Sequence, residues 1–308
     1  MGEEEYWATS ARITAPGVAA SAIAALPADP AALRAVSQRL VIHYAEQERW
    51  GEWGVGVERL PEVDTRYAAA SFDRLRAMGP ADLAAERPPA QRMVGCCRDF
   101  TVLYLTMARD KGVPARGRVG YASYFRPGWW VDHEMVELWD PGQRRWRLVE
   151  PEIVDDYVPP DGEGAFDPLD VPRERFLTGA EAWARARAGQ LDPERCLVVP
   201  ELEEPYTRSW SSLRHHVVQD LAALRKQEML LWDQWGILNG DLPISGRELE
   251  LLDELAAALR DQPRVSEIAS WSRHPGIGVP GKVTSYSPTQ VDPLEVDVRD
   301  IAEEPIAV

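Results

Sequence analysis

The chain has 308 residues, of which 45% are apolar and 27% are charged. These proportions are typical of a folded globular protein and argue against a chain that is disordered throughout. Its 34 Lys and Arg residues against 50 Asp and Glu residues leave a formal charge of −16, spread along the sequence. Nucleic acid is therefore not an expected partner, because phosphate binding needs clustered basic residues.

The sequence indicates a protein of a reducing compartment without membrane segments. No apolar run approaches the roughly 20 residues that span a bilayer, and the first residues, Met1 to Tyr6, are acidic where a secretory signal would be basic. The three cysteines are an odd number and do not suggest a disulfide framework. We therefore expect a cytoplasmic location, no membrane partner and at least one free thiol.

Helical spacing of apolar residues predicts the elements of the first third of the chain. After a flexible N-terminus at residues 1–15, residues 27–46 and 67–78 show this spacing, and Asp29 can cap the first of these helices. Residues 97–111 form a third predicted helix, whose apolar stripe ends at Gly112, a residue suited to a helix C-terminus.

Three strand-like runs follow that helix, at residues 115–125, 131–139 and 145–149. One helix leading into antiparallel strands is an α+β arrangement. Helical spacing returns further on, at residues 179–189, 209–236 and 247–261. We predict a core domain at residues 16–200, a helical C-terminal part at 201–265 and an irregular tail at 266–308.

Cys97 is the first candidate for chemistry, because it stands where a loop ends and a helix begins. Unpaired backbone N–H groups and the positive end of the helix dipole favour a thiolate at such a position, and the thiolate is the nucleophilic form of cysteine. A buried cysteine with a packing role is the alternative, and it is the simplest interpretation of Cys196, which adjoins an apolar run.

His133 and Glu150 are the second and third candidates, on two successive predicted strands. A hairpin symmetric about Pro141–Gly142 places Glu150 directly opposite His133, close enough for its carboxylate to accept an imidazole N–H. A shift of one residue would move Glu150 to the other face of the sheet. A structural histidine and a solvated carboxylate at a strand end remain the alternatives.

Several short motifs in one order resemble the bacterial transglutaminase-like superfamily. They are Gly95-x-Cys97-Arg98-Asp99-Phe100, Gly112-Val113-Pro114-Ala115-Arg116, Gly120-Tyr121, His133, and Trp146-Arg147-Leu148-Val149-Glu150-Pro151. The resemblance covers about residues 90–155 and implies a papain/transglutaminase-like core, in which the helix carrying the cysteine packs on an antiparallel sheet.

The same resemblance implies thiol chemistry on acyl groups with Cys97 rather than Cys96 as the nucleophile, because Cys97 directly precedes Arg98-Asp99. His133 would be its base and Glu150 would orient the histidine. Glu150 departs from the family pattern, which usually has Asp there. Either the strands adjust to the longer side chain, which we favour, or another carboxylate such as Asp155 takes the role.

Other residues are weighed as possible binding or metal sites. Trp129 and Trp130 directly precede the strand of His133 and are predicted to line the substrate site, with simple packing as the alternative. Trp232 and Trp235 are expected in the core, with the wall of a substrate pocket as the alternative. The adjacent His215 and His216 make a poor ligand pair on a helix. We expect no metal and no cofactor, since neither a zinc helix motif nor a phosphate-binding loop is present.

The sequence therefore predicts a cysteine-dependent acyl-transfer enzyme that acts on a peptide, amide or thioester through an acyl-enzyme on Cys97. A peptidase or amidase is favoured over a transamidating enzyme. The alternative from another class is a catalytically inactive transglutaminase-like binding or scaffold protein. A redox role for adjacent Cys96 and Cys97 is improbable, because a disulfide between neighbours is strained. The second oxyanion-hole donor and the oligomeric state stay open.

Overall fold

The computed structural model describes residues 3–202, 204–240, 243–260 and 262–305. Its central element is a five-stranded sheet in the order β5-β4-β3-β6, with β7 also paired to β4. These pairings are antiparallel except that of β7 with β4, which is parallel. The strands are β3 (Ala115–Ala122), β4 (Trp130–Asp140), β5 (Arg145–Val149), β6 (Phe176–Thr178) and β7 (Cys196–Leu197).

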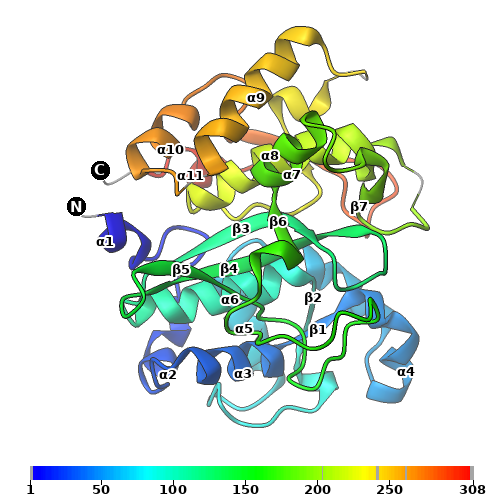
Figure 1. Ribbon diagram of the computed structural model, residues 1–308. Helices are drawn as coiled ribbons and strands as arrows, with labels where there is room; N and C mark the ends of the chain where they lie inside the picture. Colours follow the sequence, from blue (N-terminus) through cyan, green and yellow to red (C-terminus); the bar gives the residue numbers. More distant parts are fainter. Residues whose placement is uncertain (1–2, 203, 241–242, 261, 306–308) are drawn as a thin grey trace.

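Helices cover both faces of this sheet (Figure 1), which confirms the predicted α+β fold. One layer contains α2 (Ala20–Ala24), α3 (Pro30–Leu40), α5 (Ala68–Met78) and α6 (Cys97–Asp110). The other contains α7 (Gly179–Arg187), α8 (Ser209–Leu224), α9 (Gly246–Arg260) and α10 (Val265–Trp271). The predicted helix at residues 97–111 is thus present as α6, with the cysteine at its first position.

Two predicted helices are shorter than expected, because the residues at their predicted C-terminal ends adopt other structure. The first ends at Leu40, and the next residues form β1 (Val41–His43), which pairs in parallel with β2 (Met93–Gly95). The helix predicted at residues 209–236 ends at Leu224, shortly before Lys226, whose φ of 62° is left-handed and cannot continue a helix.

The predicted irregular tail contains regular structure. β9 (Lys282–Ser285) pairs with β10 (Leu294–Asp297) and with β8 (Asp233–Gln234), and α11 (Arg299–Ala302) follows. The prolines that indicated irregularity lie outside these strands, at Pro275, Pro280, Pro288 and Pro293. Two short helices, α1 (Glu3–Trp7) and α4 (Trp50–Trp53), complete the α-helices of the described residues.

The largest hydrophobic cluster of the described residues includes both ends of the described chain. Its buried residues extend from Tyr6 and Trp7 near the N-terminus to Ile301 near the C-terminus. The prediction of a flexible N-terminus at residues 1–15 is therefore wrong for its aromatic part, since the Trp7 side chain is 1% exposed. The predicted boundaries at residues 200 and 265 do not separate independent cores, because this cluster includes residues on both sides of each.

A buried ion pair fixes α8 against the sheet. Arg118 of β3 donates from Nε and Nη2 to the two carboxylate oxygens of Asp220 at 2.9 and 2.8 Å, and from Nη1 to Glu137 of β4 at 3.0 Å. All three side chains are nearly fully buried. Because removing one partner would leave an uncompensated buried charge, this network constrains how the C-terminal helices sit on β3 and β4.

Gly120 of β3 is predicted to be essential for the strand order. It lies between His133 of β4 and Thr178 of β6, and a Cβ there would come 2.0 Å from the Leu177 carbonyl oxygen. We expect Gly120→Ala to lower the free energy of unfolding by about 1–3 kcal/mol, since β6 must move to make room. Urea denaturation measures the change.

Gly117→Ala is the matched control on the same strand. Its added Cβ would meet neighbouring atoms at 3.5 Å, which is ordinary van der Waals contact. Equal losses of stability in the two variants would show that the close approach of β6 is not the cause.

Candidate active site

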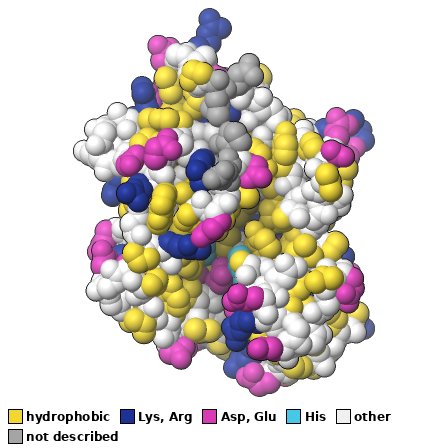
Figure 2. Space-filling view, turned by 90° about the vertical axis from the view of Figure 1, so that its right-hand side faces the viewer, with side chains coloured by type: hydrophobic (Ala, Val, Ile, Leu, Met, Phe, Trp, Pro, Cys, Tyr) yellow, Lys and Arg dark blue, Asp and Glu magenta, His cyan; other side chains and the backbone are white. Residues whose placement is uncertain are grey.

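A cavity of about 1160 Å³ is lined by residues of the sheet and of both helical layers. Figure 2 shows the molecule hollowed there, with a histidine and acidic side chains visible inside. Its lining includes residues 41–46, the start of α6, residues 131–133 of β4 and residues 152–154. The opposite side consists of cavity-lining residues between Val198 and Pro293, which we call the C-terminal wall.

Cys97 lines this cavity as the first residue of α6. Cys96 is the N-cap, and a capping box closes the helix start: the Asp99 carboxylate accepts the Cys96 N–H at 2.9 Å, and the Cys96 sulfur accepts the Asp99 N–H. The Cys97 N–H belongs to the first turn, where no intrahelical acceptor is available. A backbone donor and a thiol therefore occupy the same helix end.

Arg98 holds this helix end against distant parts of the chain. Its guanidinium is 1% exposed and donates to the carbonyl oxygens of Glu228 at 2.6 and 3.0 Å, Thr65 at 3.1 Å and Arg66 at 2.6 Å. It also pairs with Asp99 at 3.2 Å. The Cys97 position is thus set by neighbours that themselves have little freedom.

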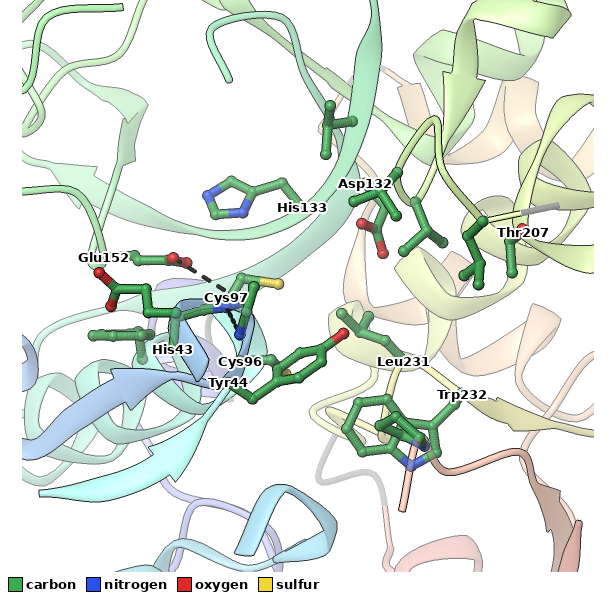
Figure 3. A pocket seen from close by; sticks show the side chains of 18 of the residues that line it. His43, Tyr44, Cys96, Cys97, Asp132, His133, Glu152, Thr207, Leu231 and Trp232 are labelled. Carbon is green, nitrogen blue, oxygen red and sulfur yellow. Dashed lines mark hydrogen bonds and ion pairs between the residues drawn. The ribbon is translucent and has the colours of Figure 1, made fainter. Parts of the chain in front are cut away.

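His133 and Glu150 form a buried pair on the sheet. The Nε2 atom of His133 lies 2.7 Å from the Glu150 carboxylate, whose oxygens also accept the Tyr124 hydroxyl and, at 2.9 Å, the Glu152 N–H. Because a carboxylate only accepts, Nε2 carries the hydrogen. The Nδ1 atom then remains as the group that can take a proton, and in Figure 3 the His133 ring and Cys97 border the same space.

The hairpin register differs from the predicted one by two residues. Glu137 lies across from Leu148, whereas a hairpin symmetric about Pro141–Gly142 would place Trp146 there. A shift of two residues keeps Glu150 on the face of His133, but as a diagonal rather than a direct neighbour. Diagonal neighbours are about 7–8 Å apart, so the longer side chain of glutamate spans a distance that would be harder for aspartate.

The turn explains this register. The ladder ends at Asp140 opposite Arg145, which leaves a four-residue loop. The Asp140 carboxylate accepts the N–H groups of Gly142 and Gln143 at 2.9 and 3.0 Å, and Arg144 adopts a φ of 52°. The loop is therefore centred one residue later than the Pro141–Gly142 pattern indicates.

The charges of the His133–Glu150 pair stabilise each other despite burial. Burial alone would lower the pKa of His133, but the charge and the hydrogen bond of Glu150 raise it above the usual value. Burial opposes the charge of Glu150 too, and His133 and Tyr124 together hold its pKa below the usual value. The pair therefore favours an imidazolium next to a carboxylate.

Cys97 does not have the lowered pKa that its helix position predicts. A hydrogen bond between the Cys97 and Cys96 thiols, burial, and the charges of Asp132 and Glu152 raise the pKa of Cys97. Among the described residues no hydrogen bond joins its sulfur to His133. Ionisation of Cys97 therefore requires the thiol to turn from Cys96 toward the free imidazole nitrogen, or the nearby carboxylates of Asp132 and Glu152 to be neutralised.

Sequence reasoning missed four cavity residues close to Cys97. Burial raises the pKa of Asp132 to about 7 and that of Glu152 to about 8. His43 accepts the Ala45 N–H at Nδ1, so its Nε2 hydrogen faces Glu152 at 3.9 Å. Tyr44, the fourth, also lines the cavity (Figure 3).

Different signals were available for these residues. Asp132 and Glu152 stand one and two positions from predicted site residues, so their acidic character could have been noticed. His43 and Tyr44 carried no such signal, because only the pairing of β1 with β2 brings them to the helix start. The Tyr44 hydroxyl has no hydrogen-bond partner within the described ranges, and it is a candidate for the open second oxyanion donor.

The predicted tryptophans do not contribute to the cavity as described. The guanidinium carbon of Arg195 lies 4.8 Å from the ring centroid of Trp129. Trp130 packs against the main core. Neither belongs to the described lining, so their substrate-binding role has no support from the geometry. Trp232 lines the cavity instead, while Trp235 is 2% exposed and belongs to the core as expected.

Asp155, the alternative orienting carboxylate, forms an ion pair with Arg34, and its side chain is 85% exposed. Cys196 is fully buried, in agreement with a packed thiol. Among the described residues no group of three or more His, Cys, Asp or Glu side chains is arranged to hold a metal ion. None of the described helices is both long enough and apolar enough to cross a membrane.

The fold and these side chains define an α+β domain with a candidate thiol site, in which a cysteine starts a helix and a histidine–carboxylate pair lies on the sheet. Comparison with known families identifies it further: residues 67–151 match the transglutaminase-like superfamily. Cys97, His133 and Glu150 all lie within the matched segment. Searches of curated proteins and of solved structures returned no match.

Replacing Glu150 is predicted to change the charge state of His133. In Glu150→Gln the burial of the imidazole is no longer offset by a carboxylate, so we expect the His133 pKa to fall below the ordinary value of 6.5. NMR titration of the imidazole signals measures it. Glu163→Gln removes an exposed acid further along the chain and should leave the His133 pKa unchanged.

The same variant has a predicted pH signature in stability. A raised histidine pKa contributes below 6.5, and a lowered glutamate pKa contributes above 4.5. The loss of stability in Glu150→Gln should therefore be largest between these values and shrink on either side. A loss that is independent of pH would contradict the ion pair.

Glu152→Gln is predicted to make Cys97 more acidic. The Glu152 carboxylate is one of the charges that raise the Cys97 pKa, and glutamine removes it with little change in size. We expect the pH profile of Cys97 alkylation by iodoacetamide to shift toward lower pH. Glu204→Gln, an exposed acid of the C-terminal wall, should not shift it; equal shifts would indicate a general charge effect.

Proposed function

We propose that this protein is a cysteine-dependent acyl-transfer enzyme that acts on an amide or thioester. Cys97 is the nucleophile, His133 is the acid–base group, and Glu150 orients the histidine and stabilises its charged form. A peptidase or amidase activity, with water as the acyl acceptor, is the favoured reaction. This assignment is more specific than the similarity of residues 67–151 to the superfamily.

In the first step the Cys97 thiol gives its proton to Nδ1 of His133, and the sulfur attacks the carbonyl carbon. The Cys97 N–H stabilises the oxyanion, with the Tyr44 hydroxyl as the second donor. The imidazolium then returns the proton to the leaving amine or thiol as the bond to the carbonyl breaks. Water, deprotonated by the same nitrogen, hydrolyses the thioester and regenerates the thiol.

The single observation that supports this proposal is that Cys97 and His133, which are distant in sequence, line one cavity while Glu150 bonds to the histidine. The Glu150 carboxylate holds Nε2 of His133 at 2.7 Å, which leaves Nδ1 on the side of the cavity that Cys97 also lines. An isolated structural histidine would not need a buried carboxylate partner in a cavity that also contains a helix N-terminal thiol.

An inactive binding or scaffold protein is the second candidate, favoured by the state of the thiol. Cys97 is 6% exposed and has a raised pKa. A domain that has lost catalysis could retain this arrangement for its contribution to the fold alone.

Iodoacetamide labelling followed by mass spectrometry separates the two candidates. For an enzyme we expect Cys97 to be alkylated at least about tenfold faster than Cys96 and Cys196, because only Cys97 has an imidazole base available. The advantage should disappear in His133→Ala and persist in His274→Ala, which changes a histidine that does not belong to the described lining. Equal, slow labelling of all three cysteines in the native protein would support the scaffold.

A further inference from the structure

The C-terminal wall of the cavity is the most informative feature that the proposed chemistry does not use. It lies outside the matched segment of residues 67–151, and it faces Cys97 across the cavity. It carries two adjacent histidines of α8, His215 and His216, and both line the cavity. With His43 and His133, four of the five histidines of the chain border this one space.

His215 presents a hydrogen-bond acceptor to the cavity. Its Nε2 lies 2.8 Å from the Leu231 carbonyl oxygen. A carbonyl only accepts, so this nitrogen carries the hydrogen. Burial lowers the pKa of His215 to about 4, which makes the ring neutral at physiological pH. The Nδ1 atom of the neutral ring is therefore an acceptor.

His216 has the opposite tautomer and an unpartnered nitrogen. Its Nδ1 donates to the Ser212 carbonyl at 2.8 Å, and burial lowers its pKa to about 3. The side chain is 3% exposed, and its Nε2 has no hydrogen-bond partner in the part of the chain that the structure describes. A buried acceptor without a donor is costly, and a ligand that donates a hydrogen bond would relieve that cost.

Asp132 adds a negative charge beside these acceptors. It is the cross-strand partner of Tyr121, whose hydroxyl lies 3.0 Å from Nδ1 of His216 and whose ring stacks on that imidazole at 4.2 Å. In Figure 3 the Asp132 carboxylate projects into the cavity between His133 and Leu231. Within the described ranges it has neither a hydrogen-bond nor an ion-pair partner of its own.

The cavity-lining arginines do not neutralise Asp132, because each already has other partners, and the charge of the neighbouring His133 favours the ionised form of Asp132. Arg49 pairs with Glu46 at 3.0 Å and Arg126 with Glu201 at 2.8 Å. Arg92 donates to backbone carbonyl oxygens. Asp132, Nδ1 of His215 and Nε2 of His216 are thus three acceptors that have no hydrogen-bond donor among the described residues.

We propose that Asp132, His215 and His216 form a subsite for a protonated primary amino group carried by the acyl part of the substrate. An ammonium group has three donors and no acceptor, which matches these three acceptors, one of which is a carboxylate. Trp232 and Leu231 of the same wall accommodate an apolar portion of the substrate. This inference rests on the proposed acyl transfer at Cys97 and specifies its substrate class.

The amino group is assigned to the acyl donor rather than to an amine acceptor. An amine must lose its proton to attack the acyl-enzyme, whereas a carboxylate with neutral acceptors stabilises the protonated form. The subsite therefore recognises an ammonium group that does not react, and water remains the acceptor.

Methanethiosulfonate reagents with different tails test the subsite on the native protein. In each case the Cys97 sulfur forms a disulfide with the reagent's thioalkyl group, and methanesulfinate leaves. At pH 8 we expect the 2-ammonioethyl reagent to modify Cys97 about tenfold or more faster, relative to its rate with free cysteine, than the neutral methyl reagent. The 2-trimethylammonioethyl reagent, which has the charge without N–H donors, should lose most of this advantage.

The ratio of rates separates recognition from reactivity, because changes in the Cys97 pKa affect all reagents alike. The ratio should fall toward one in Asp132→Asn, and by a few-fold in His215→Leu or His216→Leu. Asp292→Asn removes an exposed acid of the C-terminal wall and should preserve the ratio. A ratio that is unchanged in Asp132→Asn, or equal for the ammonio and trimethylammonio reagents, would overturn the subsite.

Two p-nitrophenyl esters distinguish the sources of the amino group. We expect the 6-aminohexanoyl ester to be hydrolysed with a kcat/KM at least about tenfold above that of the hexanoyl ester, with the difference lost in Asp132→Asn. If added propylamine instead accelerates turnover of the hexanoyl ester and forms the amide, the subsite serves an acceptor and our assignment is wrong. If neither ester reacts and Cys97 also fails the iodoacetamide test, the proposed function fails, whereas reactivity without tail discrimination overturns the subsite alone.

Discussion

The start of α6 is the constraint on which the candidate site depends. Cys97 cannot shift without disturbing Arg98 and Asp99, and Arg98 bonds to carbonyl oxygens from two distant segments while Asp99 closes the helix. Both side chains are nearly fully buried, so breaking these bonds would leave charged groups without partners. Arg98 and Asp99 therefore have a structural role in the motif, because their hydrogen bonds fix the helix start that carries the thiol.

Two sets of charged side chains near that thiol have opposite effects on proton transfer at the site. The His133–Glu150 pair favours an imidazolium, which is the state needed to protonate a leaving group. Asp132 and Glu152 disfavour a thiolate at Cys97. The balance of these charges favours a protonated thiol in the free protein.

In the proposed function, chemistry and recognition are divided between parts of the chain that are distant in sequence. The three candidate catalytic residues lie in the transglutaminase-like segment, whereas much of the cavity wall opposite Cys97 lies beyond residue 197. The pairing of Arg118 with Asp220 holds α8, and with it His215 and His216, against the sheet that carries His133. A domain with widely shared chemistry can acquire a particular substrate range through such an added wall.

Local patterns in the sequence determined the α+β fold, the helix that starts at Cys97 and the grouping of Cys97, His133 and Glu150, because helix caps, strand alternation and short motifs act between near neighbours. The tertiary structure decided the rest. The hairpin register followed from side-chain bonds within one turn, β1 replaced the end of a predicted helix because it could pair with β2, and the predicted tail became strands and a helix on the common core. The raised pKa of Cys97 and the residues opposite it likewise depend on burial and on contacts between segments more than a hundred residues apart, which no local pattern records.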